Sequence, residues 1–163
     1  MEKIIDAVPV EDIIKELTEE RFVRKTNFGH NEIYIVNAHN APNTMREIGR
    51  LREWAFRESG GGTGKSMDID EFDTRDEAYF EQLIVWDPVE KEILGGYRFI
   101  ECNKLPIKNN GQVDTPTSEL FYYSEDFIKN YLPYTIELGR SFVQPKYQST
   151  GNVRKSIFTL DNL

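Results

Sequence analysis

The sequence is short of the residues that build disulfides, metal sites and membrane spans. Cys102 is the only cysteine among the 163 residues, so no internal disulfide can form. The two histidines, His30 and His39, lie in polar segments without clustered ligands, which predicts no structural metal. Mean hydropathy is -0.57, and no run approaches the roughly 20 apolar residues that a membrane span requires. Residues 1–10 lack the basic start and apolar run of a signal peptide, so we expect a cytoplasmic protein.

Positive charge is also scarce. Lysine and arginine total 20 against 28 aspartates and glutamates, which gives a net charge of -8. A surface of this sign repels a phosphate backbone, so nucleic acid is not an expected partner. The length suits one ordinary domain, and we predict a single domain over residues 1–163.

The hydrophobic pattern predicts an α/β fold in which helices flank a mixed, mostly antiparallel sheet of about five to six strands. Helical spacing extends over residues 9–17, and again from an expected capping box of Thr44 and Glu47 to just before Gly60. Later in the chain, a short helix is expected from the cap Ser124 through residue 130, and another from residue 152 onward.

Alternating and β-branched segments predict the strands. Residues 21–26 and 32–36 have the pattern of one hairpin, and residues 80–101 that of a second. A final strand is expected over residues 135–143. Residues 103–118 are rich in Asn, Gly, Pro and Thr, which predicts a surface loop.

Residues 60–66, Gly-Gly-Gly-Thr-Gly-Lys-Ser, look at first like a phosphate-binding P-loop. The first glycine of the G-x-x-x-x-G-K-[ST] pattern falls on Ser59, and the segment follows a helix instead of a strand. The acidic stretch behind it, with Asp68, Asp70 and Asp73, would repel a nucleotide. We therefore expect a flexible loop without nucleotide binding.

Residues 134–153 combine a carboxylate with an anion-binding turn. The expected strand carries Glu137 and leads through Gln148 and Gly151 into the last helix. Backbone amides at the start of that helix, helped by Arg154, would bind a phosphate group. A carboxylate that accepts a proton from an amine, beside such a turn, suits transfer of an acyl group from a thioester to nitrogen.

Four short motifs resemble a known family in their order and approximate spacing: Arg52-x-x-x-Phe56, Asp70-Glu71-Phe72-Asp73, Gly96-Tyr97-Arg98 and Glu137-Leu138-Gly139-Arg140. They are similar to acyl-homoserine-lactone synthases and, more closely, to the hemolysin-like N-acyltransferases that make ornithine and glycine lipids. These enzymes belong to the Gcn5-related N-acyltransferase superfamily. Its Q/R-x-x-G-x-G/A loop resembles residues 148–153, except that Val153 replaces the final small residue. The resemblance covers roughly residues 51–163.

The resemblance implies a role for each matching residue. Glu137 would help to deprotonate the attacking amine, and Arg98 and Arg140 would belong to the catalytic charged network. On the substrate side, Arg52 and Phe56 would border the acyl channel, while Asp70 and Asp73 would shape the acceptor site. The cofactor-binding residues would be Gln148, Gly151, Asn152, Val153 and Arg154.

The resemblance also implies the reactants. A fatty acyl group would pass from the phosphopantetheine thioester of an acyl carrier protein, or from acyl-CoA, to the amine of an amino acid or similar small molecule, with no metal. This is lipid biosynthesis, in the cytoplasm or at the inner membrane face, with peripheral membrane contact through the product. An acidic carrier protein would need a basic patch, formed by Arg50, Arg52, Arg57 and Lys65, or by Lys146, Arg154 and Lys155.

A geometric condition tests whether Glu137 and Arg140 share a site. Residues three apart in a regular strand face opposite sides of the sheet. We therefore predict a β-bulge near Gly139, since bulges redirect side chains beside active sites.

The family fold extends past the helix in which this chain stops. The resemblance therefore implies one of three cases: the chain is a fragment, another chain completes its sheet, or the stop is a natural truncation. In the first and third cases we expect weak activity or none from the isolated chain. An exposed apolar sheet edge would also favour a homodimer or aggregate.

Other interpretations stay open. The chain could be an acetyl-CoA-dependent acetyltransferase, or a non-catalytic interaction module that keeps the fold. Glu137 and Arg140 could form only a strand-end ion pair, and Asp68, Asp70 and Asp73 only a solvated loop or a calcium site. The large aromatics Trp54, Phe56 and Trp86 also suit the core.

Overall fold

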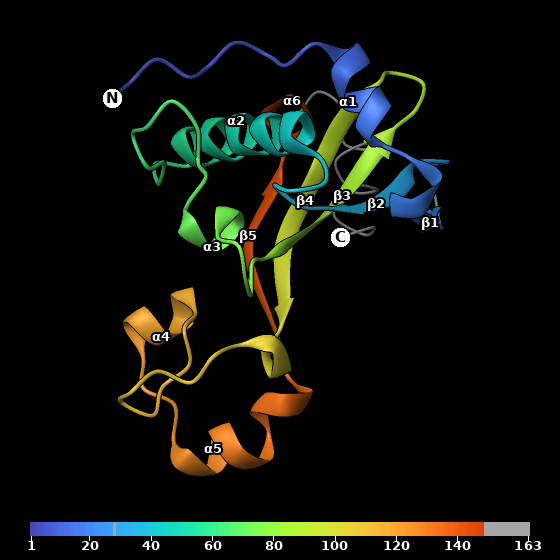
Figure 1. The fold of residues 1–163 in the computed structure, drawn as a ribbon. Helices are drawn as coiled ribbons and strands as arrows, with labels where there is room; N and C mark the ends of the chain where they lie inside the picture. Colours follow the sequence, from blue (N-terminus) through green and yellow to red (C-terminus); the bar gives the residue numbers. More distant parts are fainter. Residues whose placement is uncertain (28, 149–163) are drawn as a thin grey trace.

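The computed structural model describes residues 1–27 and 29–148, and its elements follow one another along the chain as Figure 1 shows. The helices are α1 (Val10–Glu16), α2 (Pro42–Glu58), α3 (Glu71–Thr74), α4 (Pro116–Leu120), α5 (Glu125–Asn130) and α6 (Pro145–Gln148). The strands are β1 (Phe22–Lys25), β2 (Glu32–Val36), β3 (Glu81–Asp87), β4 (Glu92–Glu101) and β5 (Ile136–Val143). Three 3-10 helices, η1 (Glu19–Arg21), η2 (Cys102–Lys104) and η3 (Leu132–Tyr134), join them.

The strands form one five-stranded sheet in the order β1-β2-β3-β4-β5. Each neighbouring pair within the described residues is antiparallel, so the parallel pairing of a mixed sheet is not found in this part of the chain. The two predicted hairpins and the final strand are confirmed, and helices flank the sheet as expected for an α/β fold. On β5, which ends the strand order, Ile136 and Leu138 are exposed. Among the described helices, none has both the length and the apolar character that crossing a membrane requires.

Helix α2 covers one face of the sheet (Figure 1) because its apolar residues recur every three to four positions. Met45, Ile48, Leu51 and Ala55 are buried in a core cluster to which the sheet contributes side chains such as Ile84. The predicted apolar stripe and the end of this helix before Gly60 are thereby confirmed.

The predicted capping box of α2 is wrong. Ala41 is the N-cap residue, and the carboxylate of Glu16 accepts hydrogen bonds from the backbone amides of Asn43 at 3.0 Å and Thr44 at 2.7 Å. Glu47 instead accepts a hydrogen bond from the amide of Val8 at 3.1 Å. The free amides at the start of α2 are therefore satisfied from α1, which is distant in sequence.

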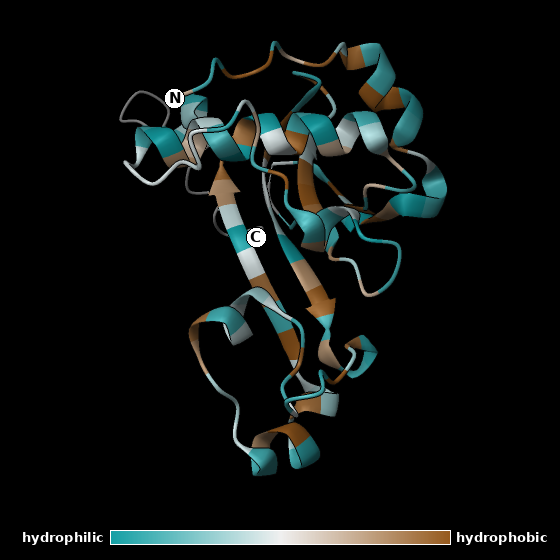
Figure 2. Cartoon of the chain, turned by 60° about the vertical axis from the view of Figure 1, so that its left-hand side comes forward, coloured by the Kyte–Doolittle hydropathy of each residue, from teal (hydrophilic) through white to brown (hydrophobic). Residues whose placement is uncertain are grey.

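Between β4 and β5, residues 102–135 build a second, smaller core at the far ends of these strands. Figures 1 and 2 both show α4 and α5 there, away from α2. Cys102, Leu105, Val113 and Leu132 are buried against Phe80 of the sheet region. The loop predicted over residues 103–118 thus has structure of its own, including η2, the start of α4 and a bridge between Ile107 and Val113. The predicted cap of α5 is confirmed, because the Ser124 side chain accepts a hydrogen bond from the Phe127 amide.

The glycine-rich segment after α2 is held by a buried carboxylate. Glu53 of α2 is 0% exposed and accepts hydrogen bonds from the amides of Thr63 and Gly64 at 3.0 and 2.9 Å, and from the Thr63 hydroxyl at 2.6 Å. Burial raises the pKa of Glu53, but these bonds and one from Arg57 outweigh it and lower the pKa below its usual range. Two amides of the P-loop lookalike are therefore already bonded to an anion of the protein. This argues against the expected flexibility and agrees with the expected lack of phosphate binding.

Candidate active site

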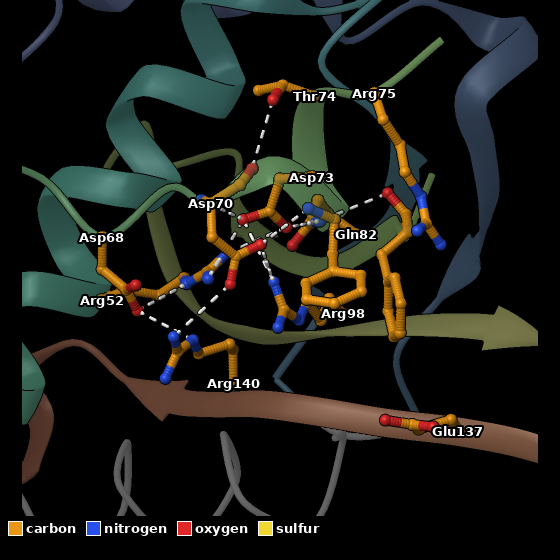
Figure 3. A network of polar contacts seen from close by, with 12 residues as sticks. Arg52, Asp68, Asp70, Asp73, Thr74, Arg75, Gln82, Arg98, Glu137 and Arg140 are labelled. Carbon is orange, nitrogen blue, oxygen red and sulfur yellow. Dashed lines mark hydrogen bonds and ion pairs between the residues drawn. The ribbon is translucent and has the colours of Figure 1, made fainter. Parts of the chain in front are cut away.

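Three arginines and three aspartates from separate elements meet beside β4 and β5 (Figure 3). We call this group the arginine–aspartate cluster. Its members are Arg52 of α2, Asp68 and Asp70 before α3, Asp73 of α3, Arg98 of β4 and Arg140 of β5. Because the formal charges balance, the cluster can lie largely inside the protein at an acceptable desolvation cost.

Arg52 forms the base of the cluster. Its side chain is 0% exposed, its Nε lies 3.2 Å from Asp68 Oδ2, and its Nη2 lies 3.3 Å from Asp73 Oδ2. Gln82 of β3 donates a further hydrogen bond to Asp73 at 3.0 Å. The resemblance implied that Arg52 borders an acyl channel, but its side chain has no exposed surface and contacts Asp68 and Asp73 instead.

Asp70 and Asp73 fix the short helix α3 as well as the cluster. The Asp70 side chain accepts a hydrogen bond from the Phe72 amide at 3.1 Å, and Asp73 accepts one from the Asp70 amide at 3.2 Å. This reciprocal capping explains the Asp-x-x-Asp spacing of the motif. The alternative of a solvated acidic loop is wrong for Asp68 and Asp73, which are 1% and 0% exposed. Across residues 1–27 and 29–148, no three acidic, histidine or cysteine side chains are grouped as metal ligands.

Arg98 links the cluster to the open side of the site. Its Nη1 lies 2.7 Å from Asp70 Oδ1 and 3.3 Å from Asp73 Oδ2, and its guanidinium stacks on Phe80 at 4.9 Å. Burial lowers the pKa of Arg98, but the two aspartates outweigh this effect and raise it. Burial likewise raises the pKa of Asp70, yet the hydrogen bond from Arg98 and the surrounding arginines lower it below its ordinary value. Both groups therefore stay charged.

Strand β5 contains the predicted bulge. Gly139 pairs with Arg98 and Phe142 with Gly96, so β5 has one residue more than β4 between these pairs. The irregularity coincides with Arg140, whose φ is 52°. Its guanidinium reaches the cluster, with Nε 3.3 Å from Asp68 Oδ2 and Nη2 3.5 Å from Asp70 Oδ2.

The bulge brings Arg140 and Glu137 to one cavity of about 350 Å³, which Asp70, Arg98 and Thr117 also line. The alternative in which Glu137 and Arg140 merely pair with each other is wrong, because Arg140 pairs with aspartates and Glu137 binds Thr117. Figure 3 shows Glu137 on β5 with no contact to the cluster itself.

Glu137 has two unequal carboxylate oxygens. Oε1 accepts hydrogen bonds from the Thr117 hydroxyl at 2.9 Å and from the Thr117 amide at 3.2 Å. Oε2 is buried and accepts none from the described residues. Thr117 was missed by sequence reasoning because its segment had the composition of a loop. The nearby Thr115-Pro116-x-Ser118 capping pattern was the signal that could have revealed a short helix there.

A second cavity of about 340 Å³ lies between the end of α2 and the end of β5. Phe56 lines it together with Phe142, Val143 and Gln148. Phe56 and the expected cofactor-binding residue Gln148 therefore line the same cavity. Gly151, Asn152, Val153 and Arg154 lie outside the described residues.

The predicted basic patches are largely neutralised. Arg52 is buried in the cluster, Arg50 pairs with Glu47 at 2.6 Å, and Arg57 pairs with Glu53 at 2.6 Å. In the second patch, Lys146 pairs with Glu92 at 2.9 Å, which also raises the pKa of this lysine. These ion pairs reduce the positive charge that the expected basic patches offer to a carrier protein.

Comparisons with known proteins show the family to which this sequence is related. Two curated relatives, both called glycine N(alpha)-acyltransferase, are 56% identical in Bacteroides thetaiotaomicron and 51% identical in Phocaeicola vulgatus, over all 163 residues of this chain. The match covers 48% and 50% of those proteins, so the chain spans about half the length of the curated relatives it matches. No solved structure matches the chain. The profile of the acetyltransferase (GNAT) domain matches residues 51–156, a segment that contains the arginine–aspartate cluster, the bulged strand and Glu137. The chain therefore belongs to the GNAT acetyltransferase domain family.

Proposed function

We propose that this chain carries the amine-activating site of an N-acyltransferase, with Glu137 as the proton acceptor. One observation carries the proposal: Glu137 lines a charged cavity, and one of its carboxylate oxygens, Oε2, is buried and accepts no hydrogen bond from the described residues. Leaving a buried polar atom unpaired costs roughly 1–3 kcal/mol, so such atoms call for an explanation. Acceptance of a hydrogen bond from a substrate amine is the explanation that fits the family.

The reaction needs no covalent intermediate with the protein. The amine nitrogen attacks the carbonyl carbon of the thioester, and Glu137 Oε2 takes a proton from that nitrogen as the C–N bond forms. The C–S bond then breaks, and the proton taken by Glu137 passes to the leaving sulfur, directly or through water, which gives the thiol and the amide and restores the carboxylate. A carboxylate in this position contributes about 10²–10⁴-fold to the rate.

The cavity suits an amino acid as the acceptor. Besides the bare acceptor Glu137 Oε2, the donor Arg98 Nε is buried without a hydrogen-bond partner among the described residues. Gly139 lies beside this donor, and an added Cβ there would be in van der Waals contact with Arg98 Nε at 3.6 Å. An amino acid presents an amine donor and a carboxylate acceptor within one small molecule, which matches this pair. The name of the two relatives makes glycine the first acceptor to test.

The acyl donor would lie along β5. Its pantetheine arm would reach the cavity beside Phe56 and Gln148, and its phosphate would bind at Gly151, Asn152, Val153 and Arg154. The donor is acyl-CoA or an acyl carrier protein, and the acyl group is a fatty one. The product is then an N-acyl amino-acid lipid, as in the hemolysin-like branch. In this proposal the protein is cytoplasmic, contacts the inner membrane face peripherally through its product, and forms a homodimer.

The test measures thiol release with glycine as acceptor and long-chain acyl-CoA, acyl carrier protein or acetyl-CoA as donor. It uses the 163-residue chain and, in parallel, the chain joined to the part of the Bacteroides relative outside the match. We expect Glu137→Gln to lower turnover by about 10²–10⁴-fold. Glu101→Gln is the matched control, because Glu101 is an exposed carboxylate on neighbouring β4, outside this cavity.

Wild-type turnover in Glu137→Gln would remove this carboxylate from the mechanism. Faster reaction with acetyl-CoA than with long-chain donors would favour the acetyltransferase alternative. If neither protein form consumes any thioester, the result would favour the alternative of a non-catalytic interaction module.

A further inference from the structure

Glu137 is held by a neighbour that no motif identified. Among the described residues, the only hydrogen-bond donors to its carboxylate are the amide and hydroxyl of Thr117, both on Oε1. We propose that Thr117 is a positioning residue that fixes the Glu137 carboxylate and leaves Oε2 as the oxygen that takes the amine proton. This inference rests on the proposed function of Glu137.

Thr117 is itself fixed by its own short turn. The Ser118 amide donates to the Thr115 hydroxyl at 3.2 Å, and the Thr115 amide donates to the Ser118 hydroxyl at 3.1 Å. Pro116 restricts the backbone directly before Thr117. The amide and the hydroxyl of Thr117 therefore converge on one oxygen without a large loss of conformational freedom.

The turn is also tied to the arginine–aspartate cluster through Arg75. Arg75 directly follows α3, which carries Asp73, and its Nη1 lies 3.1 Å from Asp114 Oδ2. Asp114 directly precedes the capping residue Thr115. Helix α3 therefore contacts both parts of the site. Its aspartates pair with Arg98, and Arg75 at its end pairs with the residue before the turn that binds Glu137. This sets the position of Oε2 relative to the charged groups of the cavity.

Two donors on one oxygen make the carboxylate asymmetric. Rotation of the side chain would break two hydrogen bonds to a charged group, and each such bond is stronger than a neutral one. Oε1 is thereby held as the bonded oxygen, and the bare Oε2 is the stronger acceptor for an incoming N–H. Preorganisation of this kind raises kcat, because the geometry is set before the substrate arrives.

The test compares Thr117→Val with Thr117→Ser in the active form of the protein that the thiol-release assay identifies. Valine keeps the shape but removes the hydroxyl donor, whereas serine keeps both donors. We expect Thr117→Val to lower kcat about tenfold, with KM for the thioester unchanged, and Thr117→Ser to restore kcat. In the Glu137→Gln background, Thr117→Val should change the remaining rate by less than about twofold, since the two residues act as one unit.

The outcomes separate this inference from the proposed function. If Glu137→Gln abolishes turnover but Thr117→Val reacts like the wild type, the positioning role is refuted and Glu137 remains the proton acceptor. A loss of kcat that Thr117→Ser shares in full would also refute it, because the hydroxyl would then not be the cause. If Glu137→Gln keeps wild-type turnover, the proposed role of Glu137 is refuted, and the positioning role of Thr117 is refuted with it.

Discussion

Replacement of Arg52 by methionine should destabilise the fold more than any other single arginine substitution on α2. Arg52 is 0% exposed and contacts two aspartates that are themselves at most 2% exposed as side chains. Methionine fills a similar volume but leaves Asp68 and Asp73 with less compensating charge. Removal of one partner of a buried ion pair costs about 3–5 kcal/mol. Arg98 and Arg140 still neutralise part of the charge of Asp73 and Asp68, so we expect Arg52→Met to lower the free energy of unfolding by about 3 kcal/mol.

Urea unfolding, followed by far-UV circular dichroism, measures this difference in the free energy of unfolding. Arg46→Met is the matched control, because Arg46 is an exposed residue of the same helix. We expect this control to change stability by about 0.5 kcal/mol or less. Addition of Asp68→Asn to Arg52→Met removes one uncompensated charge and should recover part of the loss. A cost below about 1 kcal/mol for Arg52→Met would refute the reasoning, since the cluster would then not depend on its buried arginine.

Three further predictions concern the sheet, the cluster and the glycine-rich segment. Gly96→Ala should destabilise the protein by about 1–3 kcal/mol, because a Cβ there would lie 2.5 Å from the Leu83 carbonyl oxygen. Gly61→Ala is the control, since the nearest atom to a Cβ at that position is 3.9 Å away. Equal urea midpoints for the two variants would contradict this packing argument. Asp70 has a lowered pKa, so the stability that its charge contributes is fully present above its ordinary value of 3.8 and is lost as the pH falls through the lowered value. The difference in unfolding free energy between wild type and Asp70→Asn should therefore shrink in acid. A difference that grows as the pH falls would mean that folding raises the pKa of Asp70 instead of lowering it. Glu53→Gln should cost about 1–3 kcal/mol and speed trypsin cleavage after the exposed Lys65, whereas unchanged cleavage would mean that Glu53 does not anchor this segment.

Local sequence patterns determined most of the architecture. Alternation over residues 32–36 and 80–101 specified antiparallel strands, since side chains of a strand point alternately to its two faces. The apolar stripe from Met45 to Ala55 specified the helix that covers them. The bulge at Arg140 was predicted from the family resemblance, because the resemblance implied that Glu137 and Arg140 share a site and a regular strand would turn them to opposite faces.

Only the tertiary structure decided which charged and polar groups meet. It assigned the cap of α2 to Glu16 instead of a local capping box, buried Arg52 beneath two aspartates, and placed Thr117 against Glu137 from 20 positions away in sequence. The physical reason is that periodicity records which side of an element faces the core, whereas hydrogen bonds and ion pairs depend on distances of about 3 Å between atoms of different elements. Those distances are set only when the helices and strands pack together.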